Sequence, residues 1–292
     1  MKTAILTDTN SGISADFAEK NKIYLISMPI IIDNQVFYEG KNITEEKFFD
    51  FLKNGKNIST SQPSPTEVIN KWDSILNSGY DELVYIPMSS GLSSSCETAK
   101  NLSLKLKYKN KVLVVDNRRI SVTMRNSVLQ AKSLADQEIA GIDIKKILEE
   151  DAYNSSIYLA VNDINFLKKS GRISKHAALI GNFLSIKPIL TILGGKIEPF
   201  AKIRGNMKKC ELKMIDAIKN DLETKFANNN ISRLIIGAAG AGLNSDEISE
   251  WLEILKNNFK SANICYNSLS SSISCHTGPG AVGVGISFEY KF

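Results

Sequence analysis

The chain has 292 residues, of which 43% are hydrophobic, and its formal net charge is +5. This length exceeds the roughly 100–200 residues of a single domain, so two domains with separate cores are predicted. The basic residues form no run interleaved with aromatic side chains, which argues against nucleic-acid binding, and no apolar stretch reaches the roughly 20 residues of a membrane helix, which argues against stable membrane insertion.

The start of the chain and its cysteines predict a cytoplasmic protein. Residues 3–7 read directly as a short strand that Asp8 closes, so we expect no signal peptide. The four cysteines have no CxxC spacing and the two histidines lie far apart in the sequence. Neither a disulfide framework nor a metal site is therefore predicted, and a reducing cytoplasm fits this cysteine usage.

The first half of the chain alternates strand-like and helix-like runs, the pattern of βαβ units. A strand at residues 3–7 precedes a helix near 14–20, and an apolar run at 23–32 follows it. A turn at 33–35 then precedes a short strand at 36–38, so a β-hairpin is expected to extend one sheet edge. This half is predicted to form a mostly parallel sheet flanked by helices.

The loop at residues 59–63 is rich in hydroxyl groups. Ser64 caps the helix that follows, and Glu67 is its partner in a capping box. Thr60 and Ser61 are not needed for that cap, so their side chains are free to face a ligand. An ordinary surface turn explains the loop equally well.

A turn with five serines around Gly91 follows the next strand. The apolar run 83–86 precedes it and a helix is expected at 96–106, which puts the turn at the carboxyl end of a strand. Ligands bind at that position in open α/β sheets. Its hydroxyls and free N–H groups are suited to an anion or a carboxyl group, although a serine-capped turn without a ligand is the alternative.

The second half is predicted to form a mixed sheet. Runs at 186–193 and 197–203 flank Gly194-Gly195, a two-residue hairpin signal that makes this sheet at least partly antiparallel. The glycine-rich residues 237–242 are expected to form a loop after a strand, and because they lack the order GxGxxG they indicate tight packing rather than a dinucleotide site.

We therefore predict an α/β protein with two α/β domains. The N-terminal domain covers residues 1–155, and the C-terminal domain, with the mixed sheet, covers residues 156–292. The boundary is placed there because the two helices before it form the longest connection without a strand.

Two residues of the second half are candidates because of the turns on which they are expected. Arg172 lies between a helix that ends at Gly171 and one that Ser174 restarts, so its side chain should project into solvent. His276 lies at the start of a stretch rich in glycine and proline, residues 275–285, where the backbone can approach a ligand closely.

Taken together, these segments resemble the DegV family, bacterial fatty-acid-binding proteins that serve a fatty acid kinase. The resemblance spans the whole chain. It departs from the family at Ser94-Ser95, where Gly-Thr is usual, and at Ser170, where a glycine is usual. The matching segments are the opening Thr-Asp-Thr-Asn-Ser, Thr60 to Pro63, Ser89 to Ser93, Gly171 to Ile173, Ile186 to Ile189, Arg204, and His276 through Gly283.

The resemblance implies a lipid carrier rather than an enzyme. A long-chain fatty acid would be buried between the two domains, with no other cofactor. Thr60, Ser61 and Ser93 would hold its carboxyl group, and His276 would approach the same group. The turn with Arg172, together with Arg204, would face the kinase that makes acyl phosphate.

Two other functions remain open. A serine hydrolase acting on acyl esters could use Ser93 and His276 with Asp8 or Asp116 as the acid, but residues 91–95 lack the final glycine of a nucleophile elbow. A sugar- or phosphate-sensing domain would depend on the serine turn alone, and it predicts no apolar ligand.

Overall fold

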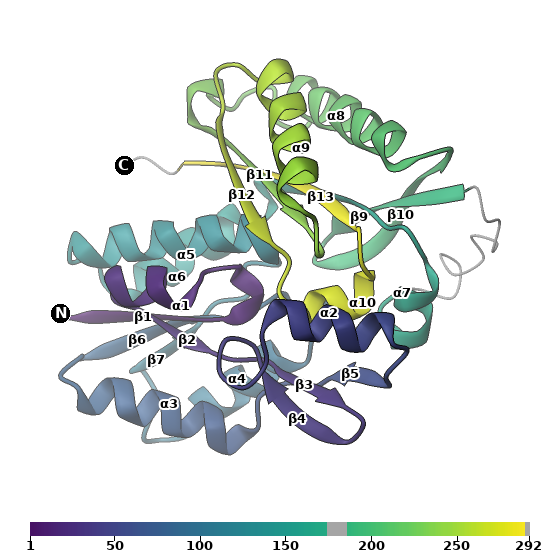
Figure 1. Ribbon diagram of the computed structural model, residues 1–292. Coiled ribbons are helices and arrows are strands. Elements are labelled where there is room, and N and C mark those ends of the chain that lie inside the picture. Colours follow the sequence, from purple (N-terminus) through teal and green to yellow (C-terminus); the bar gives the residue numbers. More distant parts are fainter. Residues whose placement is uncertain (174–185, 290–292) are drawn as a thin grey trace.

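The computed structural model describes residues 1–173 and 186–289, which form three sheets with helices packed around them (Figure 1). The first sheet is parallel and has the strand order β2-β1-β6-β7. Helices cover both of its faces, because alternate residues of each strand point to opposite sides. Its strands are β1 (Thr3–Asp8), β2 (Ile23–Ile26), β6 (Glu82–Ile86) and β7 (Val112–Val114).

The two faces of this parallel sheet have separate cores. On one face Leu6 and Tyr85 pack against α3 (Pro65–Asn77) and α4 (Ser95–Ser103). On the other face Ile5 packs against three further helices. Those helices are α1 (Ala15–Lys20), α5 (Ser121–Asp136) and α6 (Gly141–Glu150). The capping box predicted at Ser64 and Glu67 is confirmed at the start of α3.

The apolar run 23–32 is predicted to continue as one strand, but the structure divides it into two strands that belong to different sheets. β2 ends at Ile26, and β3 (Pro29–Ile32) starts a small antiparallel sheet of order β4-β3-β5. Pro29 lacks the N–H that a strand interior needs, so it is placed at a strand start. The predicted hairpin is present but belongs to this second sheet, with β4 (Gln35–Tyr38) and β5 (Ile58–Thr60), and α2 (Glu45–Lys53) lies between β4 and β5 in the chain.

The third sheet is mixed and has the order β10-β9-β8-β13-β11-β12. Only β11 and β12 pair in parallel, and the hairpin predicted at Gly194-Gly195 joins β9 to β10. The helices α8 (Met207–Glu223) and α9 (Ser245–Asn258) bury one face. The strands are β8 (Ser155–Ala160), β9 (Ile186–Leu193), β10 (Lys196–Arg204), β11 (Leu234–Gly240), β12 (Asn263–Ser268) and β13 (Val282–Phe288).

The glycines at 237–240 lie inside strand β11, so the predicted loop is wrong there. A Cβ on Gly237 would come within 2.3 Å of the side chain of Val122, and one on Gly285 of β13 would come within 2.7 Å of Thr123. Gly237 and Gly285 are partners in the antiparallel register. Together these two glycines form a patch of the sheet without side chains, which we call the bare patch. It lets the start of α5, from the first half of the chain, contact the mixed sheet directly.

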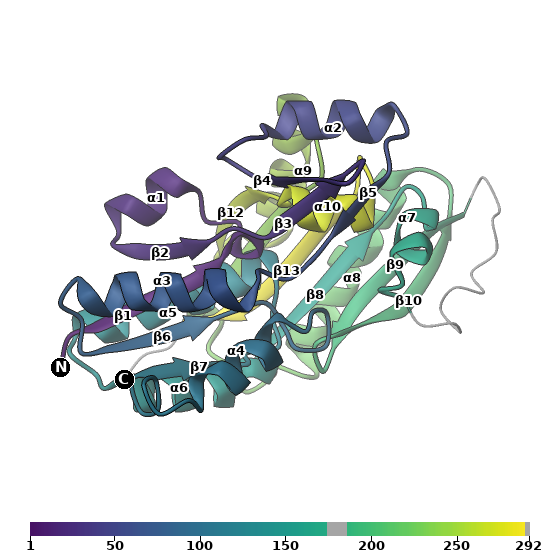
Figure 2. The ribbon, with the colours of Figure 1, turned by 90° about the horizontal axis from the view of Figure 1, so that it is seen from below.

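Two short helices complete the junction between the halves. α10 (Ser271–Thr277) lies between the three-stranded and the mixed sheets (Figure 2), and it contacts α7 (Asn165–Ser170) and β5. The α/β fold with a parallel and a mixed sheet is confirmed. The division at residues 155 and 156 stays a prediction, and the helix expected to restart at Ser174 lies outside the described residues.

Within residues 1–173 and 186–289, no helix is both long and apolar enough to cross a bilayer.

Candidate functional site

A cavity lies where the serine turn, β5 and α10 meet the face of the mixed sheet that α8 and α9 leave free. Four residues predicted to hold a carboxyl group line it, and they come from three separate segments. They are Thr60, Ser61, Ser93 and His276. Most of the remaining wall is apolar, and it includes Met28, Met88, Leu92, Val122, Ile157, Leu159, Ile192 and Ile197. The cavity therefore has a cluster of polar groups and an apolar remainder.

The polar cluster centres on Thr60 and His276. The Thr60 hydroxyl at the end of β5 lies 2.8 Å from Nε2 of His276, a hydrogen bond between residues 216 positions apart. The prediction that His276 lies on a loop turn is wrong. The residue belongs to the last helical turn of α10. The Ser270 hydroxyl caps this helix by accepting from the N–H of Ile273, and Gly278 ends it with φ +75°. A rigid element thus aims the imidazole at Thr60.

The imidazole of His276 is uncharged at neutral pH. Burial, together with the positive charge of Arg172, lowers the pKa of His276 to about 4. Its second ring nitrogen, Nδ1, is buried and has no hydrogen-bond partner among the described residues. A neutral imidazole donates from one nitrogen and accepts at the other. The ring can therefore bind an oxygen of a carboxyl group while it remains paired with Thr60.

The serine turn is fixed by its own hydrogen bonds and by the mixed sheet. The Ser93 hydroxyl accepts from the N–H of Ser95 at 3.2 Å, which leaves its hydrogen free for a ligand. The Ser89 hydroxyl donates to the carbonyl of Gly195 at 2.9 Å, across 106 positions of the sequence. This bond ties the turn to the β9–β10 hairpin. Ser61 is exposed, and its hydroxyl donates to the carbonyl of Gln62.

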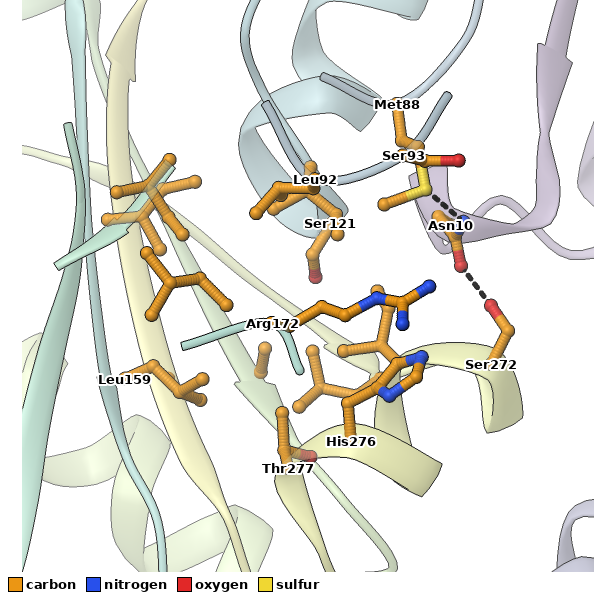
Figure 3. Close-up of a pocket in the computed structure, with 18 of the residues that line it drawn as sticks. Asn10, Met88, Leu92, Ser93, Ser121, Leu159, Arg172, Ser272, His276 and Thr277 are labelled. Carbon is orange, nitrogen blue, oxygen red and sulfur yellow. Dashed lines mark hydrogen bonds between the residues drawn. The ribbon is translucent and has the colours of Figure 1, made fainter. Parts of the chain in front are cut away.

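The two predicted docking arginines lie in different places. Arg204 ends β10 with an exposed side chain and does not line the cavity. Arg172 is also exposed, but it lines the cavity, and its guanidinium group donates to the carbonyl of Ser170 at 2.6 Å. In Figure 3 this group points to the side of the cavity on which His276 lies. A permanent positive charge therefore stands beside the polar cluster, which the sequence did not predict.

Asn10 is a lining residue that the sequence analysis missed. It is buried, and its amide donates to the sulfur of Met88 at 2.9 Å while its oxygen accepts from the hydroxyls of Ser270 and Ser272 (Figure 3). It thereby links the loop after β1 to the start of α10. Its place after a strand of the parallel sheet is the signal that could have found it.

Asp8, the last residue of β1, is buried behind the cavity wall and holds two of the lining residues in place. Its carboxyl oxygens accept from the N–H of Met88 at 2.8 Å and of Asn10 at 2.9 Å. Burial raises the pKa of Asp8 to about 6, and these two hydrogen bonds offset part of the rise. Asp8 thus titrates near neutrality while it positions two lining residues.

The geometry gives no support to a hydrolase. Asp8 bonds to backbone N–H groups, and Asp116 accepts from the hydroxyl of Ser90 at 2.5 Å and lies 3.6 Å from the ammonium of Lys100. Neither acid therefore orients the imidazole of His276, whose Nε2 is paired with Thr60. A triad needs an acid bonded to the other nitrogen, Nδ1, which has no partner among the described residues.

One cluster contains residue types that can bind a metal ion, but its carboxylates are already paired with a lysine and its thiol is protonated. Cys96, Glu97 and Asp116 place their ligand atoms within 4.8 Å of one another. Lys100 already pairs with Glu97 at 3.1 Å and with Asp116 at 3.6 Å. Burial raises the pKa of Cys96 to about 12, so its sulfur stays protonated and is a poor metal ligand.

The cavity is narrow. Its volume of about 110 Å³ is small beside the roughly 300–1,000 Å³ of most small-molecule sites. A long ligand must therefore displace lining side chains. Met28 and Met88, which pack together with Met124, have the flexible thioether side chains that adapt best to such a change.

Comparison with known proteins gives four further findings. The family model described as "Uncharacterised protein, DegV family" matches residues 2–289. A DegV domain-containing protein of Staphylococcus aureus is 30% identical over 97% of this chain and 98% of its own. A fatty acid binding DegV family protein from Streptococcus agalactiae has a crystal structure similar to this one, with TM-score 0.83 and 26% identity over 99% of this chain and 100% of its own.

A DegV family protein from Thermus thermophilus shares the fold. Its TM-score is 0.87, and it is 24% identical over 99% of this chain and 100% of its own.

Proposed function

This chain belongs to the DegV family, and from that membership and the cavity we propose that it is a carrier that binds a long-chain fatty acid. The observation that carries the proposal is the hydrogen bond between Thr60 and His276 at the polar end of an otherwise apolar cavity. The carboxyl group binds at Thr60, Ser61, Ser93 and His276, and the acyl chain lies between the parallel and the mixed sheets. The bound fatty acid is the ligand, and no other cofactor is needed.

The tail and the head group have different energetic roles. Burying a methylene group stabilises a complex by about 0.8 kcal/mol, so a chain of about sixteen carbons gains on the order of 10 kcal/mol. A hydrogen bond to the carboxyl group adds only about 1–3 kcal/mol. The apolar wall therefore sets the affinity, and the polar cluster fixes the position of the carboxyl group.

The carboxyl group is proposed to be handed to a fatty acid kinase, which makes the acyl phosphate. Arg172 and Arg204 are the proposed docking residues, and both have exposed side chains. Arg172 also lines the cavity, so it stands where a bound carboxyl group and a docked kinase would meet. Exposed charges of this kind mainly govern encounter rate and orientation.

The proposed location is the cytoplasm. All four cysteines are free thiols, which is typical of proteins in a reducing compartment.

Organic extraction tests the carrier function. Protein purified without detergent is extracted and analysed by mass spectrometry, and we expect about one long-chain fatty acid per chain. Adding fatty acid to delipidated protein should raise its melting temperature, because a ligand that binds only the native state stabilises it by mass action. If extraction yields no stoichiometric lipid and added fatty acid leaves the melting temperature unchanged, the proposal fails.

A further inference from the structure

The wall of the cavity contains a second polar site, at the start of helix α5. This helix has 16 residues, and the residue at its N-cap is Ile120, which has no side-chain oxygen that could accept from the N–H groups of the first turn. Those N–H groups have no partner within the helix. Ile120, Ser121 and Val122 all line the cavity. A helix N-terminus without a cap therefore meets the space proposed for the acyl chain.

Close packing holds this N-terminus in the wall. Gly237 and Gly285 leave the bare patch of the mixed sheet on which Val122 and Thr123 lie. No side chain of the sheet separates the first turn of α5 from the strands at that point. The helix start is thus a fixed part of the wall and not a surface end.

The side chain of Ser121 is the observation that points to a ligand. It is 7% exposed, and its hydroxyl oxygen is buried with no hydrogen-bond partner among the described residues. In Figure 3 this oxygen points into the cavity, between Leu92 and Arg172. Buried hydroxyl groups nearly always have a partner, so an unpaired one aimed at a cavity indicates a polar atom of the ligand.

Ser121 itself has a backbone conformation that few residues adopt. Its φ is +53°, which is uncommon for any residue with a side chain. A glycine would remove the strain at this position, and it would also remove the hydroxyl group.

We propose that Ser121 and the N-terminus of α5 bind a hydroxyl group on the acyl chain, so that the protein prefers hydroxylated fatty acids. This inference rests on the proposed function, in which the carboxyl group lies at Thr60 and His276. One fatty acid cannot place its carboxyl group at both sites, and Figure 3 shows Arg172 between Ser121 and His276. The oxygen at Ser121 therefore comes from further along the chain.

A hydroxyl group suits this site better than a charged one. It accepts from the N–H groups of the helix start and donates to the oxygen of Ser121. The neighbouring lining residues Ile120, Val122 and Leu92 are apolar, and the cation nearby, Arg172, points its guanidinium group toward His276, where the carboxyl group is proposed to bind. The rest of the hydroxylated chain keeps the same apolar contacts as an unsubstituted chain.

The test compares stearic acid with a series of hydroxystearic acids that differ in the position of the hydroxyl group. Affinities are measured by titration of the delipidated full chain. The wild type should bind one or two adjacent positional isomers about fivefold to tenfold more tightly than stearic acid, the effect of one hydrogen bond. The preference should depend on position because the fixed carboxyl group sets the distance along the chain.

Two variants and a matched control complete the design. Ser121→Ala and Ser121→Gly should both reduce the preference at least threefold while they still bind stearic acid, and the glycine also suits the positive φ. The control is Ser95→Ala. Ser95 is likewise the first residue of a helix, is 5% exposed and has an unpaired hydroxyl oxygen, but it does not line the cavity, so the preference should persist.

The possible outcomes separate the two proposals. A wild type that binds stearic acid but prefers no isomer overturns this inference alone, as does a preference that is undiminished in both Ser121 variants. If the variants weaken stearic acid as much as its hydroxylated forms, Ser121 contacts the carboxyl group and the inference is wrong. If no fatty acid binds, hydroxylated or not, the proposed carrier function fails.

Discussion

The hydroxyl group of Thr60 and the Nε2 atom of His276 lie 2.8 Å apart, one at the end of an antiparallel strand and the other in the last turn of a short helix. The strand belongs to the first half of the chain and the helix to the second. The bond therefore depends on how the two halves pack together, and the proposed head-group site lies where they meet.

Thr60→Val should weaken fatty acid binding. Valine keeps the shape of threonine but removes the hydroxyl that pairs with His276, so the carboxyl group loses one fixed partner. We expect a loss of about 1–3 kcal/mol in binding free energy, and a loss of stability of similar size in the delipidated protein because Nε2 of the buried His276 is left without a partner. Titration with fatty acid measures it, with the exposed Thr66→Val as the control. Equal affinity in the wild type and Thr60→Val would remove Thr60 from the head-group site.

His276 should make stability depend on pH between about 4 and 6.5. Its pKa in the folded protein, about 4, lies below the ordinary value of 6.5, so the folded state resists protonation. This contribution is fully present above pH 6.5 and is lost as the pH falls through 4, by at most about 3 kcal/mol. Urea unfolding of delipidated wild type and His276→Gln at several pH values measures the difference. Parallel pH profiles would contradict the prediction.

Asp8 should act with the opposite sign in nearly the same pH range. Its folded pKa of about 6 lies above the ordinary value of 3.8, so its contribution is present below pH 3.8 and is lost as the pH rises through 6. Asp8→Asn should therefore gain stability relative to the wild type as the pH rises from 4 to 6, by up to about 3 kcal/mol. The same urea experiment tests this. A difference between the two proteins that stays constant with pH would show that Asp8 does not titrate in this range.

Arg172→Ala should leave bound lipid and the melting temperature nearly unchanged, and it should reduce acyl phosphate formation by the proposed partner, a fatty acid kinase. An exposed charge on the rim of an interface governs docking more than folding. Added salt should weaken the wild-type complex in the same direction, because exposed charges are screened. Bound lipid and kinase-coupled turnover are measured on one preparation, beside Arg204→Ala and the exposed control Lys53→Ala.

Two results would contradict this assignment of Arg172. Loss of lipid with normal coupling would place its guanidinium group among the carboxyl ligands, a role that its position in the cavity wall permits. No change in either quantity would make it an ordinary surface arginine.

Local sequence signals predicted local structure well. The cap at Ser64 and the turn at Gly194-Gly195 depend on neighbouring residues alone, and both are present. The sequence also placed Thr60, Ser93 and His276 at one site only through a family resemblance, because nothing in their spacing reveals contacts across the chain.

The errors concern structure that distant residues determine. The sequence does not predict strands β12 and β13, and it predicts a loop at the glycines of β11, because glycine favours turns unless another element packs on it. Here Val122 occupies the place of the missing side chain at Gly237. The cavity position of Arg172 likewise depends on how α7 meets α10, which no local pattern records.

The strand order of the mixed sheet also bears on when the protein can take up its ligand during synthesis. β13 is the last described strand, yet it lies in the interior of the sheet, between β8 and β11. A nascent chain still lacking residues 282–288 cannot join those two strands, and pairings between such distant segments form slowly. If the chain is the proposed carrier, lipid uptake is then expected only after residues 282–288 have been synthesised and have paired. Until then β8 and β11 would expose unpaired apolar strands, and the chain would need protection from aggregation.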